Sequence, residues 1–544
     1  MMTVIHGRGI SAGVAIAAAH YFKGRSVRVV QTAADDPQAE LKRFESACRT
    51  AGGQLIALQQ KAAGQIGARN ASVFEIHRMM LEDQDFQETV SSAIREKKAT
   101  AEYAVQEAAQ TFEKLFSEMD DPYMKGRAAD VRDITQRLLR ILTGAQSSIP
   151  SAGCRYILAA DDLTPSETAQ LDKKQVAAIV ISKGSETSHA AIFARSMGIP
   201  AIVGAGDALN ARCEGRTVAV DGSSGVVYVD PDPGILHRMQ KKRENERQRR
   251  LTLEQYRGKP TVTKDGRSIR LCANIGSLAD ADLALENDAE GIGLFRSEFL
   301  YLETEAPPTE EQQFAVYKTV AKKFGRRPVV IRTLDIGADK QVPYLNLPVE
   351  NNPALGMRAI RLCLARPDIF RTQLRAIYRA SVYGDVAIMF PMVNSLQDVR
   401  RAKKIAREVR EELKEQAVPF RASVPVGIMV ETPASAILSD LLAREVDFFS
   451  IGTNDLTQYT LAVDRQNPSL GSFCDPHHEA LLRLIRFTAE NAHKNGIWVG
   501  ICGELGSDEE MTEAFLAMGI DELSVTPSRI LGLRAGICGP GGKT

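Results

Sequence analysis

Hydrophobic residues follow three different patterns in the first half of the chain. Residues 1–24 hold a glycine-rich turn and then an apolar run, which predicts a buried strand. Between residues 33 and 144, apolar positions recur at helical spacing among Ala, Gln, Glu, Lys and Leu, which predicts several long antiparallel helices. Short Val, Ile and Ala strands broken by glycines return in residues 147–229. We expect the two strand-bearing segments to form one α/β unit, with the helical bundle as an insertion.

A highly charged segment, residues 230–260, separates this half from the next. It contains Met239–Arg250, which has almost no apolar side chains and favours a solvated linker helix. A basic run can also bind nucleic acid, but Glu244 and Glu246 interrupt this one and no aromatic residue follows before Tyr256. We therefore interpret the segment as a linker.

Strand and helix patterns alternate through residues 261–544. Eight strand candidates with helical patterns between them predict a (β/α)8 barrel, a fold in which reactive groups gather at the C-terminal ends of the strands. The whole chain is thus expected to be a multidomain α/β protein. The strand candidates are Ile269–Ile275, Gly291–Phe295, Val329–Thr333, Val386–Phe390, Pro425–Val430, Phe448–Ile451, Trp498–Ile501 and Glu522–Val525.

Composition narrows the class of protein. At 544 residues the chain is too long for one hydrophobic core, and its 44% apolar and 25% charged residues are typical of soluble globular proteins. Its 68 basic residues balance its 68 acidic ones, so we expect neither nucleic acid nor a membrane surface as a partner. No secretion signal or long apolar run occurs, which predicts a cytoplasmic protein. The eight cysteines are scattered, without the short spacing of a zinc site or a redox dithiol.

Gly184–Arg195 places His189 between hydroxyl-bearing residues and an Ala-rich helical run. Such hydroxyls can donate hydrogen bonds to phosphoryl oxygens, and the amides that open a helix would face an anion carried on the imidazole. A lone histidine at a helix start can also do no more than cap the helix. Residues further along the chain decide between these interpretations.

Polar and charged residues follow the predicted barrel strands. Several arginines at one rim indicate a small polyanion, because a guanidinium binds phosphate and carboxylate oxygens bidentately. Glu431 and Asp455 are oxygen ligands that suit Mg²⁺ bound partly through the substrate. Any one of these residues could form an ordinary ion pair, but the whole set favours a site. The set comprises Arg296, Arg332, Glu431, Asn454, Asp455 and Cys502 after strands, with Lys340, Arg358 and Arg465 in adjoining loops.

Two features stay open from the pattern alone. Cys502 is either a buried small apolar residue at a strand end or, beside a metal and an anion, a proton donor to carbon. Val73–Leu81 packs many large apolar groups into under three helical turns, which predicts either a bundle core or a methionine-bearing docking patch.

Long motifs resemble one family. Gly184–Arg195, Asp447–Tyr459 and Leu461–Arg465 are similar to enzyme I of the bacterial phosphoenolpyruvate-dependent sugar phosphotransferase system. Asp162–Thr168 and Arg127–Asp133 extend the resemblance over essentially the whole chain. It implies a phosphoryl relay that begins sugar uptake. A phosphohistidine α/β domain, an inserted helical bundle that docks the carrier protein HPr, and a phosphoenolpyruvate-binding barrel that forms a homodimer would carry it out.

The resemblance also implies roles for residues at matching positions. His189 would take the phosphoryl group from phosphoenolpyruvate on a ring nitrogen, with Thr168 in support, and Cys502 would protonate the enolate to pyruvate. Glu431 and Asp455 would bind Mg²⁺. The residues that would hold phosphoenolpyruvate are Arg296, Arg332, Asn454, Asp455 and Arg465, with help from Lys340 and Arg358.

A histidine at the barrel mouth cannot also face a docked carrier protein, so we expect the His189 domain to swing. The expected hinges lie near Ser147–Gly153 and Asp230–Gly234, which hold Pro and Gly. A dikinase or phosphoenolpyruvate synthase would require a large ATP-binding region, and no P-loop occurs here. A regulatory protein that senses phosphoenolpyruvate without turnover is the second alternative, and the loss of His189, a metal carboxylate or Cys502 would be its sign.

Overall fold

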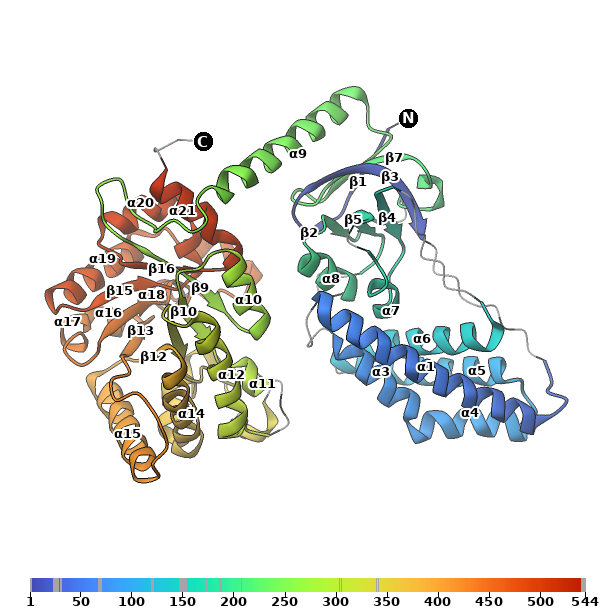
Figure 1. The fold of residues 1–544 in the computed structure, drawn as a ribbon, viewed down its shortest axis with the longest axis horizontal. Helices are drawn as coiled ribbons and strands as arrows, with labels where there is room; N and C mark the ends of the chain where they lie inside the picture. The colour runs from blue at the N-terminus through green and yellow to red at the C-terminus, as the bar shows by residue number, and fades with distance from the viewer. Residues whose placement is uncertain are drawn as a thin grey trace. The chain divides into compact units, whose positions relative to one another are not determined.

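The protein is described by a computed structural model that covers residues 2–22, 29, 32–66, 71–118, 122–145, 154–172, 174–184, 188–206, 208–302, 304, 306–338, 340 and 342–539. It divides into two compact units, Met1–Arg250 and Leu251–Thr544 (Figure 1). Among the helices of these ranges, none is long and apolar enough to cross a membrane.

The N-terminal unit contains an eight-stranded mixed sheet. Its order is β1-β8-β7-β3-β4-β5-β6-β2. Strands that precede the helical insertion, β1 to β3, therefore pair with strands that follow it, β4 to β8, in one sheet. Three strands form within the first 24 residues, where the sequence predicted one, because the chain turns at Gly7 and at Gly13, whose φ is +124°. The strands are β1 Thr3–His6, β2 Arg8–Ser11, β3 Val14–Phe22, β4 Tyr156–Ala160, β5 Val176–Ile181, β6 Ala201–Val203, β7 Thr217–Asp221 and β8 Val226–Val229.

A helical bundle is inserted between β3 and β4. Small residues such as Ala104 and Ala108 of α5 are fully buried, which lets this helix pack closely against α6. Two short helices of the α/β unit, α7 and α8, lie between the sheet and the bundle in Figure 1. Helix α8 contacts both the sheet and α1 of the bundle, and α7 contacts α8 and the bundle helices α3 and α6. The helices are α1 Pro37–Ile66, α3 Val73–Glu82, α4 Gln84–Glu96, α5 Ala101–Ser117, α6 Pro122–Thr143, α7 Pro165–Thr168 and α8 His189–Met197.

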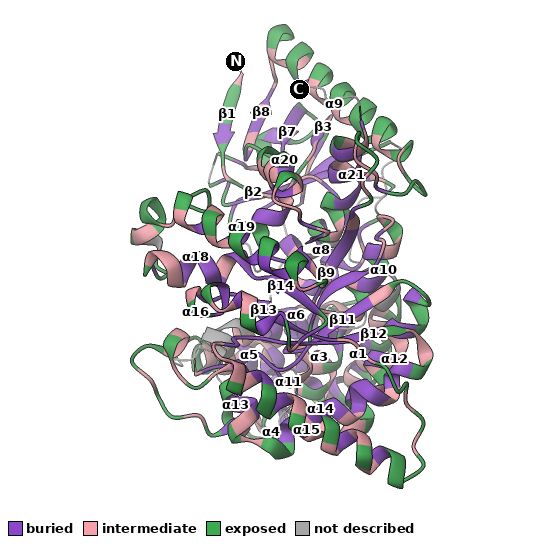
Figure 2. Ribbon diagram, turned by 90° about the vertical axis from the view of Figure 1, so that its left-hand side faces the viewer, coloured by how far each residue is buried: buried purple, intermediate pink, exposed green. Residues whose placement is uncertain are grey.

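The predicted linker is helix α9, Pro233–Glu254, and Figure 2 shows most of it exposed or half-buried. It is longer than the polar run suggested, because Asp232 accepts the N–H of Ile235 at 2.8 Å and so caps a helix that opens with a proline. Met239 is buried against the sheet, and Lys242 pairs with Asp221 of β7 at 2.6 Å. The first turns of α9 are therefore fixed to the α/β unit.

These contacts argue against a hinge at Asp230–Gly234. The N–H of Asp230 donates to the carbonyl of Thr217 at 2.9 Å, and its carboxylate pairs with Arg216 at 3.2 Å. A swing at this point would break both contacts as well as the packing of α9. The other expected hinge, Ser147–Gly153, lies outside the described residues.

The second unit is a closed barrel of eight parallel strands, which confirms the predicted fold class. The strands are β9 Arg270–Ile275, β10 Ile292–Arg296, β11 Pro328–Arg332, β12 Asp385–Phe390, β13 Val426–Val430, β14 Phe448–Ile451, β15 Trp498–Ile501 and β16 Glu522–Val525. Each predicted strand is present within one residue at either end.

Helices surround this barrel, with their apolar faces against the strands. In α14, for example, Phe370, Leu374 and Ile377 are fully buried in the core that this helix shares with its neighbours. The helices are α10 Leu278–Glu286, α11 Phe299–Leu302, α12 Glu310–Phe324, α13 Ala359–Ala365, α14 Pro367–Ala380, α15 Leu396–Glu415, α16 Pro433–Ile437, α17 Ser439–Leu442, α18 Thr453–Leu461, α19 Glu479–Lys494, α20 Glu509–Ala517 and α21 Ile530–Cys538.

Candidate functional site

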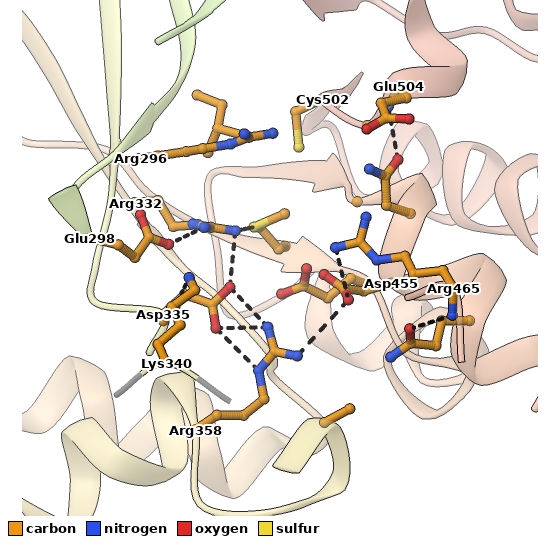
Figure 3. A pocket seen from close by; sticks show the side chains of 18 of the residues that line it. Arg296, Glu298, Arg332, Asp335, Lys340, Arg358, Asp455, Arg465, Cys502 and Glu504 are labelled. Carbon is orange, nitrogen blue, oxygen red and sulfur yellow. Dashed lines mark hydrogen bonds and ion pairs between the residues drawn. The ribbon is translucent and has the colours of Figure 1, made fainter. Parts of the chain in front are cut away.

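The carboxyl ends of the barrel strands surround a cavity of about 500 Å³. Arg296 and Arg332 end β10 and β11, while Glu431 and Cys502 directly follow β13 and β15. Because parallel strands of a barrel all finish at one rim, all four residues line the same cavity, and Figure 3 shows Arg296, Arg332 and Cys502 around it. Every rim residue predicted from the sequence lines the cavity: Arg296, Arg332, Lys340, Arg358, Glu431, Asn454, Asp455, Arg465 and Cys502.

The carboxylates of Glu298 and Asp335 pair with Arg332 and Arg358. Arg332 is buried, hydrogen bonds to Glu298 and lies 3.1 Å from Asp335, which also accepts a hydrogen bond from Arg358 at 2.9 Å. Burial opposes ionisation of Asp335, but the two guanidinium groups hold the pKa of its carboxyl below the usual range. Burial likewise disfavours the charge on Arg332, yet Glu298 and Asp335 raise the pKa of Arg332. The arginines therefore remain charged although Arg332 is buried, and burial out of bulk water strengthens their electrostatic interactions.

Glu431 is fully buried and only one of its oxygens is satisfied. Oε1 accepts the N–H of Met392 at 2.6 Å, whereas Oε2 has no hydrogen-bond partner within the described part of the chain. A Cβ on Gly452 would lie 2.9 Å from Oε2, so the glycine keeps the space beside this oxygen open. Burial raises the pKa of Glu431 to about 8, and the negative charges of Asp455 and Asp335 add to the shift. This environment favours a positively charged partner.

The donor set fits a magnesium ion. The described residues contain no cluster of three or more His, Cys, Asp or Glu side chains that could hold a metal. Mg²⁺, however, keeps several waters and commonly uses one or two protein carboxylates together with substrate oxygens. Glu431 and Asp455 offer two carboxylates to one cavity, and the unpartnered Oε2 is the oxygen that such an ion would use.

Asp455 lies between two arginines at the mouth of the cavity. Its Oδ1 is 3.9 Å from Nη1 of Arg358 and 3.9 Å from Nη2 of Arg465, which is exposed. The neighbouring Asn454 accepts the N–H of Glu504 at 2.9 Å through its side-chain oxygen. Because that oxygen is used within the protein, the amide nitrogen of Asn454 is the group left to donate to an anion.

Cys502 is buried in the cavity wall, with Sγ 3.7 Å from the carbonyl of Ile451. Burial raises the pKa of its thiol to about 11, so the thiol keeps its proton at neutral pH and suits a proton donor. A Cβ on Gly503 would collide with Oγ1 of Thr453, so only glycine fits after the cysteine. All eight cysteines of the chain are free thiols.

The second predicted site is in the N-terminal unit. His189 is the first residue of α8, and Ser188 caps this helix by accepting the N–H of Ala191 at 3.3 Å. Ser185–Thr187 lie outside the described residues, and the orientation of the imidazole is likewise not described. Thr168 is buried at the end of α7, which packs against α8, and its hydroxyl donates to the carbonyl of Thr164 at 2.7 Å. The support of His189 by Thr168 stays a prediction.

Helix α3 uses its apolar residues on two faces. Phe74, His77 and Leu81 are buried in the bundle, whereas Met79 is 63% exposed and Ile76 is half-buried. Val73 and Met80 also pack against the bundle core, so the core accounts for most of the apolar run and leaves Met79 as its exposed residue. The docking alternative stays a prediction that rests on Met79.

Models of phosphoenolpyruvate-utilising enzymes match the chain in three parts: the N-terminal domain over residues 6–127, the mobile domain over 154–225 and the PEP-binding domain over 250–539. The phosphoenolpyruvate-protein phosphotransferase of Bacillus sp. (strain S) is 45% identical over 532 residues, which cover 98% of this chain and 92% of that protein. This chain belongs to the phosphoenolpyruvate-protein phosphotransferase family. The member from Bacillus subtilis (strain 168) is 42% identical over 537 residues, which cover 98% of this chain and 94% of that protein.

Membership of the phosphoenolpyruvate-protein phosphotransferase family confirms the resemblance found in the motifs. The PEP-binding domain of the family spans the barrel and its cavity, and the mobile domain spans α7 and α8. A solution structure titled Enzyme I is 30% identical and covers 45% of this chain and 99% of that chain, with a TM-score of 0.40.

Sequence reasoning missed four of the carboxylates that line the cavity, Glu298, Asp335, Asp464 and Glu504. Glu298 and Asp335 were not predicted, although both pair with arginines there. A signal for one of them existed. Asp335 stands between the apolar residues Leu334 and Ile336, three residues after the end of β11, and all three are buried.

Proposed function

We propose that this chain transfers the phosphoryl group of phosphoenolpyruvate to its own His189 and then to an HPr-like phosphocarrier protein. Pyruvate is released, and the reaction begins sugar uptake by a phosphotransferase system. The barrel cavity carries the proposal, because it gathers paired arginines, the unpartnered oxygen of Glu431 and the thiol of Cys502. Phosphoenolpyruvate brings two anionic groups and a carbon that must accept a proton, and the cavity offers a partner for each.

The cationic residues of the cavity bind the phosphate and carboxylate oxygens. Arg332 is already oriented by Glu298 and Asp335, and its Nε is buried without a hydrogen-bond partner among the described residues. This N–H is therefore a donor for a substrate oxygen. Arg296, Lys340 and Arg465 add positive charge around the same space, with Lys340 held by a 3.4 Å hydrogen bond to the carbonyl of Asp335.

Glu431 and Asp455 would hold Mg²⁺ together with oxygens of the substrate. When bound, the ion offsets the negative charge that develops on the transferring phosphoryl group and on the enolate. The carboxylates of Glu431 and Asp455 keep their place without it, because Met392 binds the first and two arginines flank the second.

In the first half-reaction, an unprotonated ring nitrogen of His189 forms a bond to phosphorus while the bond from phosphorus to the enol oxygen breaks. The arginines align the phosphoryl group and neutralise its charge, which is most of what this transfer asks of a protein. The enolate then takes the proton of the Cys502 thiol at its terminal carbon and becomes pyruvate. Solvent returns a proton to the thiolate. Alignment of this kind contributes about 7–11 kcal/mol of barrier reduction.

In the second half-reaction, the carrier docks on the helical bundle and accepts the phosphoryl group from His189. The exposed side chain of Met79 on α3 supports this position for the docking surface. Since His189 must meet both the barrel cavity and the carrier, the α/β unit changes its position between the half-reactions. We also propose a cytoplasmic homodimer that associates through the barrel domain.

Incubation with phosphoenolpyruvate labelled in its phosphoryl group tests this function. With Mg²⁺ present, we expect an acid-labile, base-stable label on the peptide that contains His189. A protein that only senses phosphoenolpyruvate would bind it and remain unlabelled. No observation favours that alternative, because His189, Glu431 and Cys502 are all present.

A further inference from the structure

A buried imidazole links the helical bundle to the α/β unit. His77 of α3 is completely buried, and its Nε2 lies 3.0 Å from Oδ1 of Asp130 on α6. Its Nδ1 lies 3.7 Å from Oδ2 of Asp133, one turn further along α6. The two carboxylates are themselves buried, so three polar groups occupy the core at this point. Burying such groups in a core costs free energy unless they are hydrogen-bonded or paired with one another.

One of these carboxylates extends the contact into the α/β unit. Oδ2 of Asp133 accepts the backbone N–H of Ser166 in the first turn of α7, at 3.0 Å. A second tie joins the same helices, because Arg140 of α6 pairs with Glu167 of α7 at 3.2 Å. Helix α7 packs in turn against α8, which begins with His189.

These contacts connect α3 with α8, the two helices that phosphoryl transfer to the carrier would involve. Helix α3 exposes Met79 and leaves Ile76 half-buried on the face away from His77. Helix α8 begins with the histidine that would donate the phosphoryl group. Asp133 is shared, since the same oxygen faces His77 and the N–H of Ser166. The position of α3 is thus coupled to that of α7 through two side chains.

We propose that His77 is a positioning residue for the transfer from His189 to the carrier. This role rests on the proposed function and concerns only one half-reaction. His77 and Asp133 hold α7 and α8 in a fixed position relative to the face of α3 on which the carrier would dock. The transfer from phosphoenolpyruvate takes place at the barrel cavity, so it does not depend on the position of α7 and α8 relative to α3. Loss of His77 therefore affects the second half-reaction and spares the first.

Two variants test the inference. His77→Leu fills the site with an apolar side chain, and Asp133→Asn keeps an oxygen for Ser166 while removing the charge beside the imidazole. Thr135→Val is the matched control, because this buried hydroxyl of the same helix has no hydrogen-bond partner among the described residues. Each purified full-length chain is labelled from phosphoenolpyruvate and then mixed with HPr of Bacillus subtilis in single-turnover experiments.

For both variants we expect the rate of His189 labelling to stay within about twofold of the parent. The rate of transfer at saturating HPr should fall on the order of tenfold, with the half-saturating HPr concentration unchanged. The double variant should lose no more than the stronger single variant, because the two residues act as a unit. Thr135→Val should match the parent in both half-reactions.

If the rates of both half-reactions fell equally, His77 would only stabilise the fold. If the rate of transfer to HPr did not change, His77 would have no role in positioning. Either result overturns the inference. If His77→Leu does not fold, the rates of His189 labelling and of transfer to HPr in Asp133→Asn test the proposal on their own. Absence of label on the unsubstituted chain would instead contradict the proposed function, and the inference with it.

Discussion

Oδ1 of Asp335 lies 2.9 Å from Nη2 of Arg358, and the Asp335 side chain is buried where it lines the cavity at the barrel rim. The same side chain reaches Arg332 at 3.1 Å. One carboxylate thus sets the position of two guanidinium groups that line the cavity. Because removing one member of a buried ion pair leaves an unpaired charge, this residue has a large effect on the pocket.

Asp335→Asn should lower the rate of His189 labelling by roughly 10- to 100-fold at saturating phosphoenolpyruvate, because Arg332 and Arg358 lose their common anchor. Stopped reactions over a range of substrate concentrations measure this. The matched control is Asp368→Asn, which breaks an exposed pair with Arg366 at 2.8 Å and should change little. If the Asp335→Asn variant labelled His189 at the rate of the parent, the two arginines would not need Asp335 to hold them.

Removal of the metal gives a second prediction. EDTA should abolish labelling of His189, and added Mg²⁺ should restore it. Independently of activity, Mg²⁺ should raise the unfolding temperature of the parent by roughly 2–4 °C for about 1 kcal/mol of binding free energy. Glu431→Gln should lose this shift, because the substitution replaces the unpartnered carboxylate by an amide.

Glu522→Gln is the control for that experiment. Glu522 is also a buried carboxylate of the barrel, and its Oε2 accepts no hydrogen bond within the described residues, although it lies 3.6 Å from Nε of Arg270. It is not among the residues that line the cavity. Its variant should keep the Mg²⁺-dependent shift. Loss of the shift in both variants, or in neither, would contradict the assignment of the metal to Glu431.

The pKa of Cys502 predicts an unusual alkylation profile. Since burial raises that pKa to about 11, the thiolate fraction should grow about tenfold per pH unit between pH 7 and 10. The rate of iodoacetamide modification at Cys502, followed by mass spectrometry of its peptide, should rise with this slope. At pH 8 the modification should be far slower at Cys502 than at the exposed Cys154. A plateau near pH 8 would show that the thiol titrates normally.

The ion pair that attaches α9 to the α/β unit predicts a dependence of stability on pH. Burial opposes ionisation of Asp221, but hydrogen bonds from Lys242 and Ser224 outweigh it and lower the pKa of its carboxyl. A depressed pKa contributes stability above the unfolded pKa of about 4, and this is lost as the pH falls through the folded pKa. Lys242→Met should therefore destabilise the N-terminal unit at pH 7 by about 0.5–1 kcal/mol, and by less at pH 3.

Urea unfolding at the two pH values measures this difference. Lys241→Met, an exposed neighbour on the same helix, should be neutral at both. An equal loss for Lys242→Met at pH 3 and pH 7 would show that its contact with Asp221 is not electrostatic.

The barrel was predictable from sequence for a physical reason. Its strands are buried on both sides and so appear as continuous apolar runs, such as Ile428–Val430, that stop where the side chains meet solvent or substrate. The residue after such a run, Glu431 or Cys502, was identified for the same reason. The strands at the N-terminus were not separated, because turns at Gly7 and Gly13 cut the apolar pattern into pieces too short for a clear period.

The charge network inside the cavity was only partly predictable. Arginines and a strand-terminal glutamate indicate an anion and a metal by their chemistry alone. Glu298 pairs with Arg332 and Asp335 with Arg358, each far away along the chain, and such a pairing depends on three-dimensional distances. His77 is a similar case, since its partners are more than 50 residues away on α6.

The coupling of pyruvate release to carrier labelling tests the central claim most directly. Parent and His189→Ala are incubated with labelled phosphoenolpyruvate, Mg²⁺ and HPr, and pyruvate and labelled HPr are counted together. The account predicts one labelled HPr for each pyruvate in the parent and neither product in His189→Ala. Coupled formation of both products by His189→Ala would contradict it.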